Sequence, residues 1–232
     1  MNTSLENRTI VIGGGTGDVG VEITAKLLAS GATVIALIRS IARAKAFGDH
    51  PRLHLIEDFP EDEAAVHRVR SSLAGFGLIH GAVASLGPWF HGPALTELPL
   101  EDWEHMVTSS LTSHYLFARA VVPSLKNSGQ YVMINGAGAL QPIPHSGVVS
   151  VLAHAQIMLG QVLAAENPAT KVHTLMLRSI IATRARPQHD PTWISASEVG
   201  EMVAWLVSPQ GRLTGSSTTE MHPKDAQSPT FH

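Results

Sequence analysis

The feature that most constrains this chain is a regular alternation of short apolar runs with longer segments of helical periodicity. The short runs are rich in β-branched and aliphatic residues, and they lie at 9–12, 33–38, 53–56, 78–84, 131–134 and 172–177. Apolar residues recur at helical spacing over 18–29, 62–73, 101–125, 149–166 and 196–207. Continuously apolar strands that alternate with helices are typical of βαβ units around a parallel sheet. The pattern therefore predicts an α/β fold of the doubly wound (Rossmann) type, a three-layer sandwich with a parallel central sheet.

The length of the chain limits how many such cores it can build. Its 232 residues suit one α/β domain and leave too little for a second. We expect a single domain over 1–215 and a polar C-terminal tail over 216–232. With 44% apolar and 15% charged residues, the chain can bury a large core, which excludes a disordered protein.

Composition also excludes several classes of function. There are 16 Lys and Arg against 19 Asp and Glu, a net charge of −3, without a basic run, so we expect no nucleic-acid partner. The absence of cysteine excludes disulfides and thiol chemistry. The sequence has no run of about 18 apolar residues and no apolar signal segment at its start, so we expect no membrane partner and a cytoplasmic location.

A glycine-rich turn, VIGGGTGDVG, occupies residues 11–20 between the first expected strand and helix. Glycines let the backbone approach a diphosphate, and the helix that follows offers unpaired N–H groups and the positive end of its dipole. The turn predicts dinucleotide binding, with contacts from Gly14, Thr16, Gly17, Asp18 and Val19. Asp18 has two readings: it caps the helix, or its charge repels the phosphates.

The end of the second expected strand bears on the choice of nucleotide. Arg39 and Ser40 follow it, where an acidic residue would hydrogen-bond the ribose 2′-hydroxyl of NAD. Arginine can instead hold a 2′-phosphate through its planar fork of donors, so the sequence favours NADP over NAD. The alternative is an arginine that is merely solvated.

From about residue 8 to 215 the chain resembles the short-chain dehydrogenase/reductase superfamily. The resemblance is carried by the glycine spacing 14, 17 and 20, by the pair Asp58-Phe59, and by the segments HGAVASLG (80–87), 103–123, 172–185 and 195–217. It implies a nicotinamide nucleotide as cofactor. The positions that it implies for cofactor contacts, besides those above, are Asp58, Phe59, Ala84, Ser85, Ile181 and Thr183.

The same resemblance locates the family's catalytic groups, and this chain departs from all four. Val149 and Ala153 occupy the tyrosine and lysine positions, Gly136 the serine position and Ser110 the asparagine position. Valine, alanine and glycine have no side-chain proton to donate. We therefore expect an atypical member in which the usual acid–base mechanism does not operate, with Ser110 as a candidate site residue.

Two histidines on the expected site loops are candidates for a replacement acid. His91 follows an aromatic stretch and His145 lies four residues before Val149; an imidazole titrates near pH ~6.5, close to working pH. Each is equally interpretable as an ordinary loop histidine. Ser146, Ser150 and His154 share a helical spacing, which is more typical of a subunit interface than of a triad.

The histidines show no spacing that indicates a metal site. His50 and His54 flank a proline, and no HExxH pattern occurs, so we expect no metal. Aromatic and aliphatic residues of two loops, instead, predict an apolar pocket, or alternatively a packed rim of the sheet. They are Trp89, Phe90, Leu140, Pro142 and Ile143.

Three functions remain open from these residues. The first is NADP(H)-dependent oxidoreduction of a small apolar or aromatic substrate without the family's Tyr/Lys pair. The second is a non-redox enzyme, such as a cyclase, isomerase or dehydratase, and the third is a non-catalytic ligand-binding protein. In each case we expect a homo-oligomer, a dimer or tetramer formed through helices 101–125 and 149–166, because both carry more apolar residues than one sheet face needs.

Overall fold

The computed structural model describes residues 3–187, 190–211 and 216–223, and it contains a seven-stranded parallel sheet in the order β3-β2-β1-β4-β5-β6-β9. The strands are β1 (Thr9–Gly13), β2 (Thr33–Leu37), β3 (Leu53–Ile56), β4 (Ile79–Ala84), β5 (Leu125–Gly136), β6 (Lys171–Leu177) and β9 (Ser217–Met221). The helices are α1 (Asp18–Ala29), α2 (Glu63–Ala74), α3 (Leu100–Met106), α4 (Ser113–Val121), α5 (Gly147–Glu166) and α6 (Ala196–Leu206).

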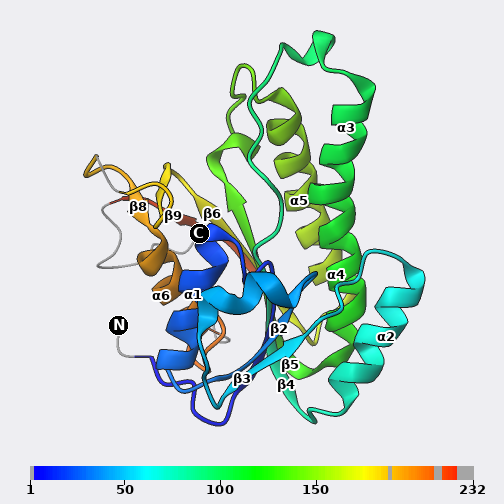
Figure 1. Ribbon diagram of the computed structural model, residues 1–232, viewed down its shortest axis with the longest axis vertical. Coiled ribbons are helices and arrows are strands. Elements are labelled where there is room, and N and C mark those ends of the chain that lie inside the picture. The colour runs from blue at the N-terminus through cyan, green and yellow to red at the C-terminus, as the bar shows by residue number, and fades with distance from the viewer. Residues whose placement is uncertain (1–2, 188–189, 212–215, 224–232) are drawn as a thin grey trace.

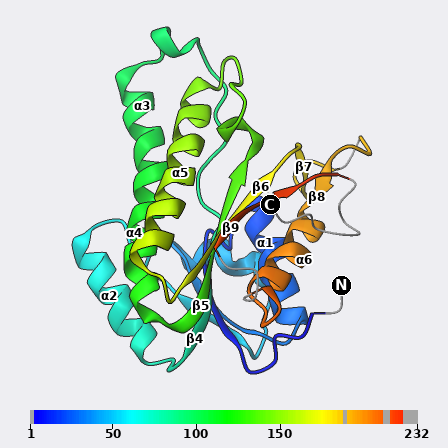
Figure 2. The same ribbon diagram turned by 180° about the vertical axis from the view of Figure 1, so that it is seen from behind.

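The helices cover both faces of the sheet. α1 and α6 pack together on one face, and α2, α4 and α5 lie on the other (Figures 1 and 2). The strand order reverses direction at β1, which pairs with β2 on one side and with β4 on the other. The prediction of a doubly wound three-layer sandwich is therefore confirmed.

Each strand contributes to two cores because successive side chains point to opposite faces. Ile10 and Ile12 of β1 belong to the cluster under α1 and α6, whereas Val11 between them belongs to the cluster under α2 and α4. All three are fully buried. Burial on both faces explains why the strands read as unbroken apolar runs.

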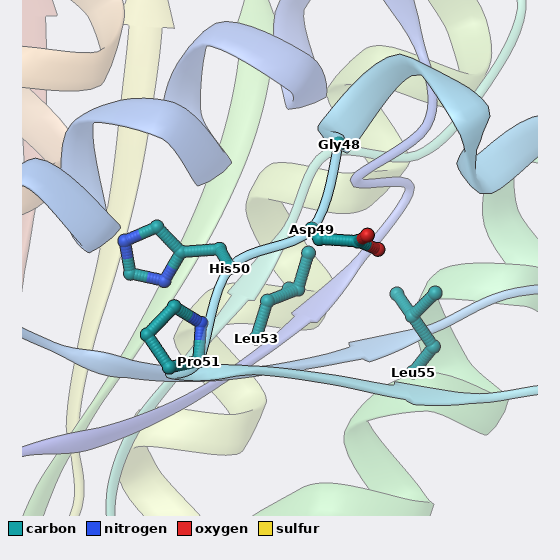
Figure 3. Close-up of a pocket in the computed structure, with 6 residues that line it drawn as sticks. All are labelled: Gly48, Asp49, His50, Pro51, Leu53 and Leu55. Carbon is teal, nitrogen blue, oxygen red and sulfur yellow. The ribbon is translucent and has the colours of Figure 1, made fainter.

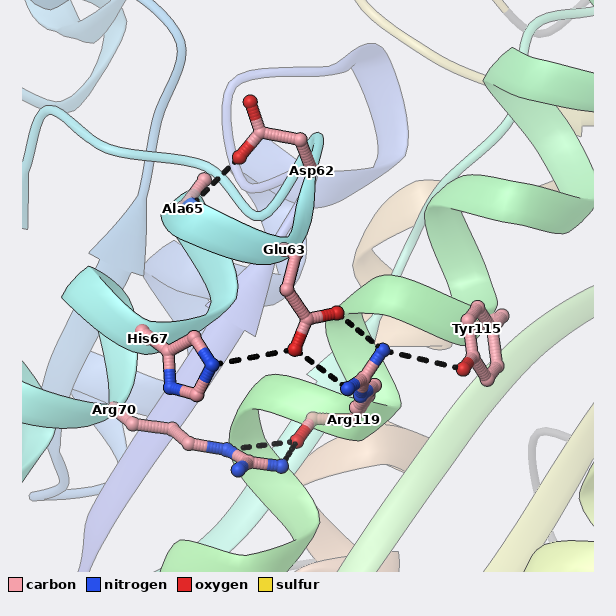
Figure 4. Close-up of polar contacts among 7 residues, drawn as sticks. All are labelled: Asp62, Glu63, Ala65, His67, Arg70, Tyr115 and Arg119. Atoms are coloured by element: carbon pink, nitrogen blue, oxygen red, sulfur yellow. Dashed lines mark hydrogen bonds and ion pairs between the residues drawn. The ribbon is translucent and has the colours of Figure 1, made fainter.

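Polar groups hold the helices on the second face together (Figure 4). Asp62 caps α2 by accepting from the Ala65 N–H at 2.7 Å. Glu63, in the first turn of α2, pairs with Arg119 of α4 at 2.5 Å, and Arg70 donates to the Arg119 carbonyl. These contacts fix α2 against α4 and so define the rigid side of the domain.

Two expected boundaries differ from the structure. The helix expected over 101–125 is interrupted, since a π-helical segment, Val107–Thr112, separates α3 from α4, and β5 already begins at Leu125. The tail expected from residue 216 contains β9, the seventh strand, which pairs with β6 from His173↔Ser217 to Leu177↔Met221. Threonine and methionine at alternate positions bury one side of this edge strand, a pattern too short to stand out in the sequence. Residues 224–232 and the boundary near 215 lie outside the described residues.

Helix α5 is unusual in its apolar composition. Among the described residues it alone has the length and hydropathy that a membrane span requires. In this fold it runs beside α3 and the π-helical segment and contacts β5 and β6 (Figure 2). Its mixed environment, one side on the sheet and another toward solvent, explains the low amphipathicity of the segment.

Candidate functional site

The glycine-rich turn brings the backbone of β1 against that of the segment after β4. Gly14 has a φ of +78°, and a Cβ there would lie 1.9 Å from the Ser85 carbonyl oxygen. A Cβ on Gly20 would lie 2.0 Å from the Gly14 carbonyl oxygen. Only glycine fits at these two positions, so the turn is built for close approach of backbone to backbone and to a ligand.

The N-terminus of α1 opens from this turn without a side-chain cap. Gly17 is its N-cap residue, and no side chain accepts from the first N–H groups of the helix. Such a terminus attracts phosphate oxygens, so the backbone here fits a diphosphate. The Asp18 side chain does not cap the helix, and as an exposed carboxylate it places a negative charge at the same terminus.

Arg39 lies at the end of β2 in a defined but exposed position. Its Nε is 2.5 Å from Glu61 Oε1, and its guanidinium carbon lies 4.3 Å from the centre of the Phe59 ring. An exposed ion pair of this kind contributes at most about 1 kcal/mol, so a phosphate can displace Glu61. Ser40 accepts from the Ala42 N–H at 3.3 Å and caps the 3-10 segment Ile41–Phe47.

The pair Asp58-Phe59 follows β3, as the sequence comparison with the family predicts. Both Asp58 carboxylate oxygens accept from Arg68, at 2.7 and 3.0 Å. Phe59 is buried and stacks on Phe117 of α4, with ring centres 6.2 Å apart. These contacts form a firm edge beside the glycine-rich turn, where the predicted adenine position lies.

A cavity of about 940 Å³ lies beyond the carboxyl ends of β5 and β6 and the start of α1, and it is bordered by α5. Six of the predicted cofactor positions line it, and these are Gly17, Asp18, Val19, Ser85, Ile181 and Thr183. The other predicted positions do not line it, namely Gly14, Thr16, Arg39, Ser40, Asp58, Phe59 and Ala84. The second group lies in the turn or along the ends of β2, β3 and β4, where a long nucleotide would extend out of the cavity.

All four positions that the resemblance aligns with catalytic residues line this cavity. Val149 and Ala153 lie one turn apart on α5 and face it together. A Cβ built on Gly136, at the end of β5, meets nothing within 4 Å. The space that a serine side chain would fill is therefore open cavity.

Ser110 lines the cavity from the π-helical segment. Ser109 and Ser113 beside it donate to backbone carbonyls of their own helix, at 2.8 and 2.6 Å. Ser110 is equally buried, and among the described residues its hydroxyl has no partner. The wider π turn thus presents one free hydroxyl to the cavity, as such turns often do at functional sites.

The two candidate histidines lie close to each other but outside the cavity lining. The rings of His91 and His145 are 5.7 Å apart, and His145 Nδ1 lies 3.2 Å from the Gly92 carbonyl oxygen. His91 Nδ1 lies 3.5 Å from Ser146 Oγ. These contacts tie two loops together, which is the ordinary structural role, so an acid function for either histidine stays a prediction without support from the cavity.

The serine and histidine spacing on α5 also has a structural role. Ser150 Oγ accepts from the Ile143 N–H at 3.1 Å, and His154 Nδ1 lies 2.9 Å from the Ala139 carbonyl oxygen. Both contacts hold the loop between β5 and α5. The interface role expected for this face is a different one, and the contacts here are within one chain.

The tyrosines offer no acid near this cavity. Tyr131 is fully buried in β5, and burial raises the pKa of its hydroxyl. Tyr115 lies on the outer side of α4, 3.5 Å from Arg119 Nη1 (Figure 4). Neither is among the residues that line the cavity.

One buried histidine supports the loop that forms the cavity roof. His114 of α4 is fully buried, and its Nε2 lies 3.3 Å from the Leu86 carbonyl oxygen. Burial lowers the pKa of this histidine to about 4, so it is neutral at physiological pH and holds the loop as a hydrogen-bond donor.

Sequence reasoning missed three polar residues of the cavity lining. Asn135 ends β5, Gln156 lies on α5 and Arg186 follows β7 (Ile181–Ala182). Gln156 had a usable signal, because it lies three residues after Ala153 and seven after Val149 and so shares their helix face. Arg186 had none, since its loop has no regular period.

A second, smaller hollow lies at the outer edge of the sheet (Figure 3). It is lined by the loop before β3 and by Leu53 and Leu55 of that strand. Asp49 and His50 lie beside it, but within the described part of the chain no three metal-binding side chains lie together. It is remote from the glycine-rich turn and adds nothing to the cavity above.

Comparison with known proteins agrees with this geometry. Residues 16–220 match the family model described as enoyl-(acyl carrier protein) reductase. An uncharacterised NAD-dependent oxidoreductase of Mycobacterium tuberculosis is 31% identical over 184 residues, which cover 67% of this chain. The matched region spans 66% of the length of that relative, slightly under two thirds.

Solved structures show the same fold. A short-chain type dehydrogenase/reductase from Mycobacterium ulcerans has a TM-score of 0.85 at 19% identity, over 98% of this chain and 93% of that one. One from Serratia marcescens has a TM-score of 0.82 at 20% identity, over 94% and 97%. A blue fluorescent protein from a metagenomic library, in complex with NADPH, has a TM-score of 0.81 at 19% identity, over 94% and 97%. The chain belongs to the short-chain dehydrogenase/reductase family of oxidoreductases.

Proposed function

We propose that the protein is an NADP(H)-binding oxidoreductase that acts on a small apolar or aromatic substrate without a side-chain proton donor. The observation that carries the proposal is the single large cavity that joins an uncapped helix N-terminus to an apolar wall. The first part suits a dinucleotide diphosphate, and the second suits a neutral substrate.

The residues of the turn fit the diphosphate by an observation independent of the family. Two glycine positions exclude any Cβ, and the first N–H groups of α1 have no side-chain partner. In this proposal Gly17 and Val19 hold the diphosphate through backbone N–H groups, while Ser85, Ile181 and Thr183 border the nicotinamide. When bound, the nucleotide supplies or accepts a hydride.

The preference for NADP rests on Arg39. Its guanidinium lies flat over Phe59 at the edge where the adenine ribose would lie, and it needs only to exchange Glu61 for a phosphate. The NADPH complex of the blue fluorescent protein supports the preference, while the M. tuberculosis relative is named as NAD-dependent. The two precedents differ, so Arg39 decides the proposal.

The lining of the cavity limits which reductions suit it. Of the described residues that line it, only Asp18 and Arg186 carry ionisable side chains, and both are exposed. A carbonyl that takes up hydride also needs a proton at its oxygen. A C=C bond or an imine-like carbon depends less on a fixed acid, because the proton can come from water. The enoyl reductase description of the family model supports a C=C substrate.

The same wall supports a second candidate, a ligand-binding protein without turnover. Ser110 and Gln156 can hold a ligand in the cavity, but neither side chain is an acid at neutral pH. This candidate shares nucleotide binding with the first and differs in catalysis. Non-redox catalysis has no such support, since it relied on His91 or His145.

Titration with NADPH and NADH tests the proposal directly. We expect NADPH to bind the purified protein, raise its melting temperature and bind more tightly than NADH, because a ligand of the folded state stabilises it. Substrate-dependent oxidation of NADPH with enone or imine substrates then separates the oxidoreductase from the ligand-binding protein. Absence of binding by either nucleotide at millimolar concentration would refute both.

We further propose that the protein is a homo-oligomer through the outer face of α4 and α5. Val151, Met158 and Val162 of α5 and Tyr115 of α4 are large, apolar and exposed by 42–58%. Their helical spacing gathers them on one side, and a contiguous apolar patch is typical of a subunit interface. The cytoplasmic location expected above stays a prediction.

A further inference from the structure

Helix α5 presents one continuous face to the cavity. Val149, Leu152, Ala153 and Gln156 all line it, at spacings of three, four and seven residues that place them on one side of a helix. The first three side chains are apolar. Gln156 is thus a single amide in an otherwise apolar wall.

The amide of Gln156 is buried and unpartnered. The residue is only 6% exposed, and among the described residues its side chain makes no hydrogen bond. An amide has two N–H donors and an acceptor oxygen, and burying these groups without partners destabilises the folded protein. A residue that costs stability at the wall of a cavity points to a ligand group that pairs with it.

Other buried amides in the protein are paired at both ends. Gln130 donates to the Ser208 carbonyl oxygen at 2.6 Å and accepts from Arg8 at 2.7 Å. Asn135 donates to the Ala153 carbonyl oxygen at 2.8 Å and accepts from the Gly136 N–H at 2.7 Å. Gln156 departs from this pattern at the one place where the amide borders open space.

The direction of the side chain supports a role in binding. Side chains on an α-helix lean toward its N-terminus, so the Gln156 amide leans over the turn that contains Ala153. The methyl group of Ala153 leaves that space free. The amide is therefore directed along the cavity toward Val149 and not toward the lower packing of α5.

We propose that Gln156 is a ligand-binding residue that hydrogen-bonds a neutral hydroxyl or carbonyl group of the molecule in this cavity. The inference rests on the proposed function in taking this cavity as the ligand site. A neutral group is expected because an amide offers a donor and an acceptor side by side without charge, and a carboxylate would meet no cation beside Gln156. Two sources present such a group: the ribose of the nucleotide and the substrate itself.

The test uses Gln156→Leu, which keeps the shape and removes the amide, and Gln161→Leu as the matched control. Gln161 is on the same helix but exposed and outside the cavity lining. Binding is measured for NADPH by its fluorescence, and for benzyl alcohol and toluene by ligand-observed NMR. Melting temperatures without ligand are measured alongside.

We expect Q156L to weaken one hydroxyl-bearing probe by about tenfold, the size of one or two neutral hydrogen bonds, while Q161L binds as the wild type. Weaker NADPH binding assigns the ribose, and weaker binding of benzyl alcohol with unchanged toluene assigns the substrate. Without ligand, Q156L should melt about 2 °C or more above the wild type, because an unpaired amide is replaced by an apolar group.

Equal binding of all three probes by Q156L and wild type would overturn the inference. So would a lower melting temperature of Q156L with loss of all three probes together, which is the result of a structural role. Failure of the proposed function looks different. In that case the wild-type protein does not bind NADPH, whereas the contrast between benzyl alcohol and toluene still reports on Gln156.

Discussion

The side-chain amide of Asn135 donates a 2.8 Å hydrogen bond to the backbone carbonyl of Ala153, and this bond joins the end of β5 to the middle of α5. The same amide oxygen accepts from the Gly136 N–H at 2.7 Å. Because Ala153 sits among the cavity-facing residues of α5, the bond fixes how that helix is rotated and how far it lies from the sheet. It thereby sets the shape of the cavity wall.

Replacing Asn135 by alanine should destabilise the fold and widen the cavity. Loss of the two hydrogen bonds leaves a buried carbonyl and N–H unpaired, which lowers the free energy of unfolding by about 1–3 kcal/mol. Urea unfolding measures this change, and NADPH titration at low temperature measures the weaker binding that follows from a displaced α5. Asn167→Ala is the control, since Asn167 donates only within its own helix, to the Leu163 carbonyl. Equal loss of nucleotide binding in both variants would contradict the role of Asn135.

Replacing Asp18 by asparagine should tighten binding of NADPH. The carboxylate lies in the first turn of α1, where the diphosphate is expected, and it caps nothing there. Removing one exposed negative charge beside the phosphates should lower the Kd by about two- to fivefold at low salt, and less at high salt. Isothermal titration at two salt concentrations measures this, with Asp49→Asn at the remote edge of the sheet as control. Weaker binding in D18N would show instead that the carboxylate holds the turn.

Arg39 and Glu61 should affect NADPH in opposite directions. Arg39→Ala removes the proposed partner of the 2′-phosphate and should weaken NADPH by about tenfold or more, with little change for NADH. Glu61→Gln frees the guanidinium from its 2.5 Å ion pair and should tighten NADPH by about two- to fivefold, the size of an exposed ion pair. Parallel fluorescence titrations with both nucleotides measure the ratio. If both variants change NADPH and NADH equally, Arg39 does not select between them.

Stability should fall as the pH falls from 6.5 toward 4. Burial lowers the pKa of His114 and of His173 to about 4, below the value near 6.5 that both have in the unfolded chain. In that window the unfolded state binds more protons, so protonation favours unfolding. Each histidine should cost about 2 kcal/mol by pH 5. Chemical unfolding at pH 7 and pH 5 measures the slope, and H114N should reduce it. A flat profile between these pH values would contradict the burial of both rings.

The apolar outer face of α5 should control the oligomeric state. Met158→Glu places a charge at the centre of this face and should convert an oligomer to monomers, because burying an unpaired carboxylate is costly. Light scattering after size exclusion measures the mass. Leu55→Glu, at the exposed edge strand β3, is the matched change and should leave the mass as it is. A monomeric wild-type protein would refute this interface.

The sequence alone determined the layers of the fold, because parallel strands buried on both faces must be apolar throughout and their helices must follow the 3.6-residue period. It also determined the diphosphate turn, since Gly14 and Gly20 have no room for a Cβ. β9 escaped, because a five-residue edge strand with polar outer positions has too little pattern to detect. The π-helical turn that frees the Ser110 hydroxyl also escaped, because π and α turns share one apolar period over so short a span.

The tertiary structure decided what each candidate side chain contacts. His91 and His145 lie on loops that the sequence places near the site, yet they bond each other's loops outside the cavity. Gln156 becomes notable only when the cavity and the absence of any partner among the described residues are both known. Sequence spacing gives the face of a helix on which a residue lies, but burial and hydrogen-bond partners depend on chain segments far away in sequence. Only the packed structure brings those segments together.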